Sequence, residues 1–221
     1  REVLAKLTDL PLDNAAFPWL TGQVAEVGLA TDVYLLRVNF VGAPVARTPV
    51  EAEQGRLDTM VGAGAATVRE VEPVLKAFCE NIFHIGGPGT GHKVKLINNF
   101  LALGSAALAA ESLSIAAKVG IDLAVFEKLI SAGGANSAMF QMIVPKALKG
   151  ELSGLLFTLV NAKKDIGYYQ QMAAAAPFSG LMGGALFQTL VQANALGLGE
   201  KFVPSLIEAY EKVNGIRVVN H

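Results

Sequence analysis

The residues whose types and spacing favour chemistry fall in one helical turn, at Lys95, Asn98 and Asn99. The spacing i, i+3, i+4 places these side chains on one face of a helix. A lysine near the start of a helix opposes the helix dipole, and burial would lower its pKa. One interpretation is a general acid or base lysine beside two amides that orient a small polar substrate. The other is a solvated first turn.

Three more segments carry polar groups that suit a binding site. The run GGPGTGHK at 86–93 fails the phosphate-loop pattern, because His92 stands where that loop needs lysine, and it is typical of a flexible turn before a helix. The run NAKKD at 161–165 is either a solvated patch or part of a site. Arg47, in a loop after a strand, suits either an anionic group or a surface salt bridge.

Signatures of other chemistries are missing from the sequence. His84 and His92 flank the glycine-rich run without a third ligand at suitable spacing, so no metal site is predicted. No G-x-S-x-G motif supports acyl transfer. A single cysteine, Cys79, excludes an internal disulfide and fits a reducing, cytoplasmic compartment.

Composition sets the class of protein. The chain has 221 residues, 52% hydrophobic and 17% charged, which excludes a disordered chain and suits one large or two small domains. A net charge of −1 gives no basic excess for nucleic acid or an anionic membrane. The most apolar run, Val94–Val119, includes Lys95 and Glu111, which favours a buried alanine-rich helix over a membrane span. No signal peptide is visible.

The pattern of elements changes near residue 92. Before it, short strands at 39–44, 57–61 and 81–85 with a helix at 65–80 predict a βαβ unit and a partly parallel sheet. After it the sequence predicts only helices, with Gly120 as a stop and Asp122 as a cap. The predicted helices span residues 93–119, 123–131, 137–149, 157–174, 180–196 and 204–214.

Four segments in order resemble the β-hydroxyacid dehydrogenases, which include 3-hydroxyisobutyrate, tartronate semialdehyde and sulfolactaldehyde oxidoreductases. They read FVGAPVART, GRLDTMVGA, GPGTGHKVKLINN and NAKKDIGYY, and the resemblance covers about residues 39–214. It implies an α/β segment at 1–91, part of a Rossmann-like dinucleotide-binding domain. It also implies an all-α domain similar to that of 6-phosphogluconate dehydrogenase at 92–221, for substrate binding and dimerisation.

The resemblance also assigns roles to single residues. Lys95 matches the catalytic lysine, which protonates the carbonyl oxygen as hydride arrives. Lys164 matches the lysine near the nicotinamide of NAD or NADP, and Asp165 helps to position it. The substrate-binding residues implied are Arg47, Thr48, Asn98, Asn99 and Phe157.

Two departures from the family pattern qualify these roles. Residues 44–48 read PVART where many members read PVSGG, similar to the sulfolactaldehyde reductases, so a sulfonate or carboxylate head is expected. No G-x-G-x-x-G occurs before Asn39, and forty residues cannot contain two βαβαβ halves. In addition, Asp32–Val38 runs into the strand at 39–44 with no turn signal, which indicates a missing connection.

The prediction is an NAD(P)-dependent oxidoreductase that interconverts a small anionic aldehyde or ketone and its hydroxy acid. Its expected partners are the small substrate and further copies of the chain, in a homodimer or a tetramer. The alternative is a non-catalytic dimerisation or binding module without a functional nucleotide domain. A decarboxylating relative similar to 6-phosphogluconate dehydrogenase ranks last, because the helical domain of that enzyme is much longer.

Overall fold

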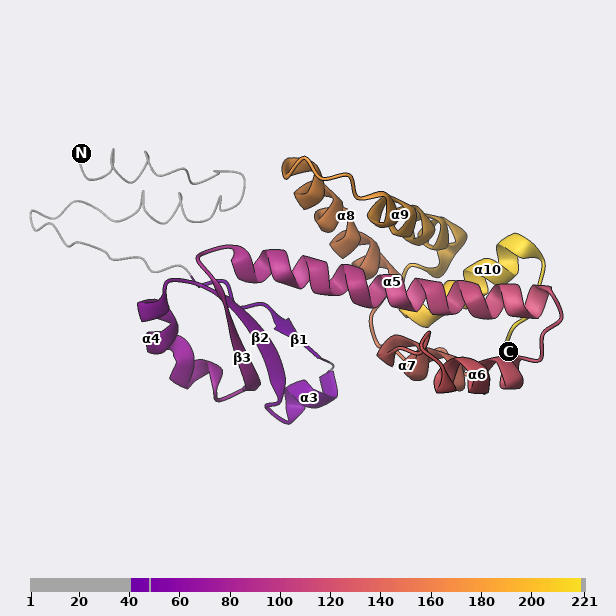
Figure 1. Cartoon of the computed structure of the whole chain (residues 1–221), viewed down its shortest axis with the longest axis horizontal. Coiled ribbons are helices and arrows are strands. Elements are labelled where there is room, and N and C mark those ends of the chain that lie inside the picture. The colour runs from indigo at the N-terminus through magenta and orange to yellow at the C-terminus, as the bar shows by residue number, and fades with distance from the viewer. Residues whose placement is uncertain (1–40, 48, 220–221) are drawn as a thin grey trace, which may run out of the picture. The chain divides into compact units, whose positions relative to one another are not determined.

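The computed structural model describes residues 41–47 and 49–219, so Asp32–Val38 and Thr48 lie outside the described residues. Figure 1 shows a small sheet with flanking helices and a long helix that continues into a helical body. The elements are β1 (Val45–Ala46), α3 (Pro49–Glu53), β2 (Leu57–Gly62), α4 (Ala65–Leu75), β3 (Cys79–Gly86), α5 (Thr90–Lys118), α6 (Leu123–Ala132), α7 (Ala138–Ala147), α8 (Leu159–Ala175), α9 (Leu181–Ala193) and α10 (Leu206–Asn214).

The sheet confirms the predicted βαβ unit, with corrections at its boundaries. Its strand order is β1-β2-β3, with β2 antiparallel to β1 and parallel to β3. The strand predicted at 39–44 is wrong over its described part, because only Gly42 forms a bridge there and β1 begins at Val45. The helix predicted to reach residue 80 ends at Leu75, since the chain from Cys79 pairs with β2 instead.

The helical body is built around α5, which packs against α6, α7, α8, α9 and α10. In Figure 1, α8 and α9 lie along one side of α5, and α6 and α7 lie along the other. By length and composition α5 could cross a membrane, but 44% of its most apolar window is buried inside the structure. The largest fully buried side chains of this core include Leu113, Ile143, Leu159, Ile166, Leu190, Leu206 and Ile207.

Both predicted signals at the end of α5 are confirmed. The helix ends at Lys118, and Gly120 adopts φ 78°, a left-handed conformation that glycine adopts without a Cβ penalty. The Asp122 side chain then accepts hydrogen bonds from the backbone N–H groups of Ala124 and Val125, at 2.9 and 3.1 Å. These contacts cap α6 and satisfy donors that the helix itself leaves open.

The N-terminus of α5 lies in backbone contact with β2. A Cβ added at Gly91 would lie 2.1 Å from the carbonyl oxygen of Met60 and 3.0 Å from the amide nitrogen of Gly62. A Cβ at Gly62 would in turn lie 2.7 Å from the amide nitrogen of Gly91. Only glycine fits this approach, so the pair fixes where α5 starts and where Lys95, one turn further along, is placed.

At the opposite end of β2, Arg47 joins the first residues of two strands. Its Nη2 lies 2.8 Å from Asp58 Oδ1, and its Nη1 pairs with Glu80. Asn81 also donates to Asp58 at 2.8 Å. The hydrogen bond from Arg47 is the main cause that lowers the pKa of Asp58 below its ordinary value, and it lowers the pKa of Glu80 too. Arg47 therefore forms the surface salt bridge that the sequence left as one alternative.

Gly91→Ala is expected to destabilise the fold, whereas Gly104→Ala in the same helix is not. A Cβ at Gly104 meets only Leu186 at 4.0 Å, so alanine there adds up to about 1 kcal/mol of helix propensity. At Gly91 a backbone carbonyl must move, and overpacking of this kind costs about 1–3 kcal/mol or more. Urea denaturation of the two variants measures the difference. Equal midpoints would contradict the backbone contact.

Arg47→Ala is expected to weaken the loss of stability in acid. The folded pKa of Asp58 lies below its unfolded value of about 4, so its contribution is present above that value and is lost as pH falls through the folded pKa. Without Arg47 the Asp58 pKa rises and the unfolding free energy falls less steeply below about pH 4. Arg56→Ala is the control, because the carboxylate that Arg56 pairs with is Glu80, at 3.5 Å, and not Asp58. Carboxyl NMR titration measures the Asp58 pKa in the wild type and in both variants. An unchanged Asp58 pKa in Arg47→Ala would count against the pairing.

Candidate active site at the contact of α5 and α8

A cluster of polar side chains forms where the first turns of α5 meet the middle of α8. Asn99 on α5 donates from Nδ2 to Asp165 Oδ2 on α8 at 2.7 Å. The other Asp165 oxygen, Oδ1, lies 3.3 Å from Lys164 Nζ. The Asp165 carboxylate also acts on Lys95, one helical turn before Asn99. The structure thus brings together four of the residues that the sequence singled out, although the two helices are far apart in the chain.

Apolar packing holds the two helices in this register. Ala162 and Ile166 on α8 are fully buried in the helical core, which leaves Asp165 at the edge of that core. The rings of Phe100 on α5 and Tyr169 on α8 stack with centroids 4.4 Å apart and planes 5° apart. Each ring lies next to a cluster residue, Phe100 directly after Asn99 and Tyr169 one turn after Asp165. The aromatic pair therefore fixes the rotation and separation that the hydrogen bond needs.

Lys95 is the perturbed cation of the cluster. Its side chain is half-buried, and no hydrogen bond or ion pair within the described part of the chain reaches it. Burial lowers the pKa of Lys95 below that of an ordinary lysine, and the negative charge of Asp165 opposes this shift. A lysine with a lowered pKa exchanges its proton nearer to neutral pH, which suits a general acid or base.

The two remaining polar groups are more open to solvent. Asn98 is exposed and donates to Asn99 Oδ1 over 3.5 Å, which is at the limit of a hydrogen bond. The side chain of Lys164 is 53% exposed, so its ammonium keeps a free side beyond its contact with Asp165. Lys164 therefore offers a positive charge to a small anion at the rim of the cluster.

The other predicted site residues lie elsewhere or outside the described residues. Phe157 packs against the helical core, and its carbonyl accepts from the Val203 amide at 2.8 Å. Arg47 is held by Asp58 and Glu80, as described above. Within residues 41–47 and 49–219, no hydrogen bond or ion pair links either side chain to the cluster, and Thr48 is not described.

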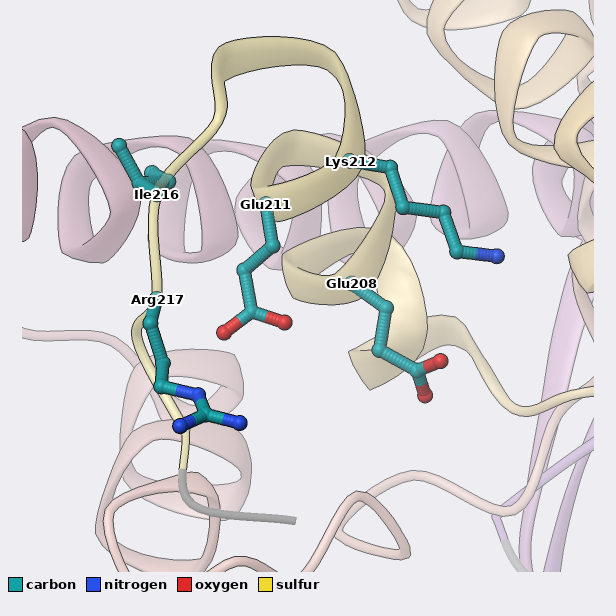
Figure 2. Close-up of a pocket in the computed structure, with 5 residues that line it drawn as sticks. All are labelled: Glu208, Glu211, Lys212, Ile216 and Arg217. Atoms are coloured by element: carbon teal, nitrogen blue, oxygen red, sulfur yellow. The ribbon is translucent and has the colours of Figure 1, made fainter.

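A hollow lies at the end of α10 and contains none of the predicted residues. Figure 2 shows its lining, which consists of Glu208, Glu211, Lys212, Ile216 and Arg217. Its carboxylates serve the fold: Glu208 pairs with Lys201 at 2.6 Å, and Glu211 accepts from the amides of Val218 and Val219 at 2.6 and 3.0 Å. Within the described ranges, no three His, Cys, Asp or Glu side chains gather as a metal site.

Sequence reasoning missed the hydrogen bond between Asn99 and Asp165. It placed both residues at the site through the resemblance, but it gave Asp165 only Lys164 to position. No spacing rule connects residues 66 positions apart. The available signal was indirect: Asp165 falls at the polar edge of an otherwise apolar helix face, next to the buried Ile166.

Two family models match this chain. A model described as the NAD-binding domain of NADP-dependent 3-hydroxyisobutyrate dehydrogenase matches residues 89–210, more than half of the chain. A model described as the NAD-binding domain of 6-phosphogluconate dehydrogenase matches residues 25–86. The first covers α5 to α10 with the Lys95 cluster, and the second covers the described sheet and sequence before it.

Named relatives support the same relationship. The chain is 29% identical to 2-(hydroxymethyl)glutarate dehydrogenase of Eubacterium barkeri, over 82% of this chain and 60% of that protein. It is 30% identical to 3-sulfolactaldehyde reductase of Escherichia coli, over 81% of this chain and 60% of that one. The chain therefore spans about 60% of the length of the curated relatives it matches.

A solved structure is similar to this chain in both fold and sequence. 3-Hydroxyisobutyrate dehydrogenase from Salmonella typhimurium is 28% identical, with a TM-score of 0.68 over 77% of this chain and 60% of that chain. These relatives are named as enzymes, which does not favour a non-catalytic module. The match of the helical model over more than half of the chain shows that the chain belongs to the β-hydroxyacid dehydrogenase family.

Proposed function

We propose that this protein is an NAD(P)-dependent oxidoreductase that interconverts a small anionic aldehyde or ketone and the corresponding hydroxy acid. Residues 92–221 form its substrate and dimerisation domain, and residues 1–91 form part of its dinucleotide-binding domain. The observation that carries the proposal is the half-buried Lys95, with its pKa lowered by burial, beside the Asn99–Asp165 hydrogen bond in a chain of this family.

The substrate class is supported by the names of the relatives. They are a 2-(hydroxymethyl)glutarate dehydrogenase, a 3-sulfolactaldehyde reductase and L-threonate dehydrogenases. Each named compound combines an anionic carboxylate or sulfonate with a hydroxyl or aldehyde group. Lys164, with its exposed ammonium, and Lys95 give the cluster the positive charge that such compounds need.

Among the described residues, those that suit NAD(P) are the polar groups that would lie near its nicotinamide ring. Lys95 and Lys164 supply donors and charge, and Asn99 supplies a polar amide, for a carbonyl compound beside a nicotinamide. The G-x-G-x-x-G turn that holds the pyrophosphate in dinucleotide-binding domains does not occur in this sequence before Asn39. The chemistry that the described residues can supply therefore lies around the carbonyl group of the substrate.

When bound, the reduced nicotinamide supplies the hydride that the carbonyl carbon accepts. The carbonyl oxygen then gains negative charge, and Lys95 transfers a proton from Nζ to this oxygen to form the hydroxyl group. In the oxidative direction neutral Lys95 takes the same proton back. Burial favours the neutral amine and the Asp165 charge favours the ammonium. Burial is the larger effect, so the pKa of Lys95 lies below its ordinary value and the neutral amine is easier to reach.

Assembly and location complete the proposal. On α5, Leu101, Leu108 and Ile115 recur every seven residues and are each more than half exposed. A second copy packed on this stripe would remove it from water, which supports a homodimer or a tetramer of dimers. We place the protein in the cytoplasm, without a nucleic acid or membrane partner, which the net charge of −1 and the single, buried Cys79 support.

Lys95→Ala is expected to lower kcat at least about a hundredfold, because a positioned proton donor contributes about 10²–10⁴-fold. Lys93→Ala is the matched control, since Lys93 is an exposed lysine of the same helix. NADH- or NADPH-dependent reduction of 3-sulfolactaldehyde and oxidation of 3-hydroxyisobutyrate measure kcat, and nucleotide fluorescence measures binding. Near-normal kcat in Lys95→Ala would contradict the catalytic role. A protein that binds neither nucleotide would favour the non-catalytic module.

Leu108→Glu is expected to separate the subunits, because it places a charge in the middle of the apolar stripe. Val74→Glu is the control, since Val74 is equally open but lies on α4, away from the stripe. Sedimentation or light scattering at micromolar concentration compares the masses in solution. A wild-type monomer, or a Leu108→Glu variant that remains a full oligomer, would argue against an α5 interface.

A further inference from the structure

We propose that Asp165 is a positioning residue that fixes the Asn99 amide with its nitrogen toward α8 and its oxygen toward the substrate. Asn99 then accepts a hydrogen bond from the hydroxyl group of the hydroxy acid and does not bind its anionic head. This inference rests on the proposed function, because it names which part of the substrate Asn99 recognises.

The chemistry of the contact between Asn99 and Asp165 determines which end of the amide faces the carboxylate. A carboxylate can only accept hydrogen bonds, whereas an amide side chain has a donor and an acceptor end. Asp165 therefore selects the Nδ2 end of Asn99, at 2.7 Å. The Asp165 side chain is 17% exposed, so water competes weakly for this bond, and a charged acceptor strengthens it.

Because the amide is planar, the position of Asn99 Nδ2 also determines where Oδ1 points. With Nδ2 turned to Asp165, Asn99 Oδ1 points away from α8 and toward Asn98, whose Nδ2 lies at 3.5 Å. That distance is at the limit of a hydrogen bond, so the oxygen keeps acceptor capacity. Asn99 lies one turn from Lys95 on the same helix face. The face thus presents a proton-transfer group and, beside it, a fixed acceptor.

Asn99 Oδ1 and Lys95 suit the hydroxyl group of the substrate better than its anionic head. An anionic head on the Oδ1 side of Asn99 would meet the amide oxygen, with the Asp165 carboxylate on the far side of the same amide, and both disfavour negative charge. A hydroxyl group has a donor that fits Oδ1. Proton transfer from Lys95 to the carbonyl oxygen creates this O–H, so the acceptor lies where the new donor forms. The head is left to cations such as Lys164, whose side chain is 53% exposed.

Asp165 also contacts Lys164, at 3.3 Å, so the alternative is that it serves only to hold that lysine. Two variants separate these roles. Asp165→Asn keeps the size of the side chain but can present either end of its amide, so Asn99 loses its fixed orientation. Lys164→Gln removes the ion pair and leaves the bond between Asn99 and Asp165 in place.

The first experiment uses no turnover. Side-chain amide hydrogen exchange of Asn99, measured by 15N NMR, is compared with that of exposed Asn98 in the same protein. We expect the Asn99 amide protons to exchange at least about tenfold more slowly in the wild type and in Lys164→Gln, and to lose this protection in Asp165→Asn. Equal exchange of Asn98 and Asn99 in the wild type, or protection that survives Asp165→Asn, would overturn the positioning role.

The second experiment tests what Asn99 recognises. Binding of 3-hydroxyisobutyrate is compared with that of isobutyrate, which lacks only the hydroxyl group. We expect a preference of about tenfold for the hydroxy acid, lost in Asn99→Ala and in Asp165→Asn, while Lys164→Gln weakens both acids alike. Equal weakening of both acids by Asn99→Ala, or no preference in the wild type, would overturn the hydroxyl assignment. Failure of the proposed function appears separately, as a wild type without nucleotide-dependent turnover.

Discussion

The close approach of α5 to β2 is the constraint on which the rest of the site depends. One helix must begin against the sheet backbone, where Gly91 and Gly62 leave no room for a Cβ, and must also support the helical core along its length. Its start and its rotation are therefore both fixed. Lys95 and Asn99, which follow Gly91 by about one and two turns, have their positions set by packing of the Gly91 and Gly62 backbones and of the helical core.

The electrostatics of the cluster follow from this placement. Burial lowers the pKa of Lys95 on α5, and the packing of α8 on α5 brings in Asp165, whose charge opposes that shift. Asp165 divides its two oxygens between Asn99 on α5 and its neighbour Lys164. The Asp165 carboxylate thus orients the Asn99 amide and partly offsets the lowering of the Lys95 pKa. Both effects depend on the stacked rings of Phe100 and Tyr169 beside it.

Sequence patterns predicted the helices and strands more accurately than they predicted the contacts between them. Glycine and aspartate signals located the end of α5 and the cap of α6, because these depend on local backbone chemistry. The strand near residue 40 was misplaced, since the choice between Val41–Pro44 and Val45–Ala46 is made by pairing with β2. Spacing put Lys95 and Asn99 on one face, but the partner on α8 could not be deduced from spacing. Arg47 suited an anion as well as a salt bridge, and only the positions of Asp58 and Glu80 show which bond it forms.

The most direct test of the account is the titration of Lys95 itself, followed by 13C NMR after reductive methylation of the lysines and assigned with Lys95→Arg. The account predicts a midpoint below the ordinary lysine value of 10.5, since burial outweighs the charge of Asp165. It also predicts a still lower midpoint in Asp165→Asn, because the opposing charge is then gone. A midpoint at or above 10.5, unmoved by Asp165→Asn, would show a solvated lysine and would contradict the assignment of the active site.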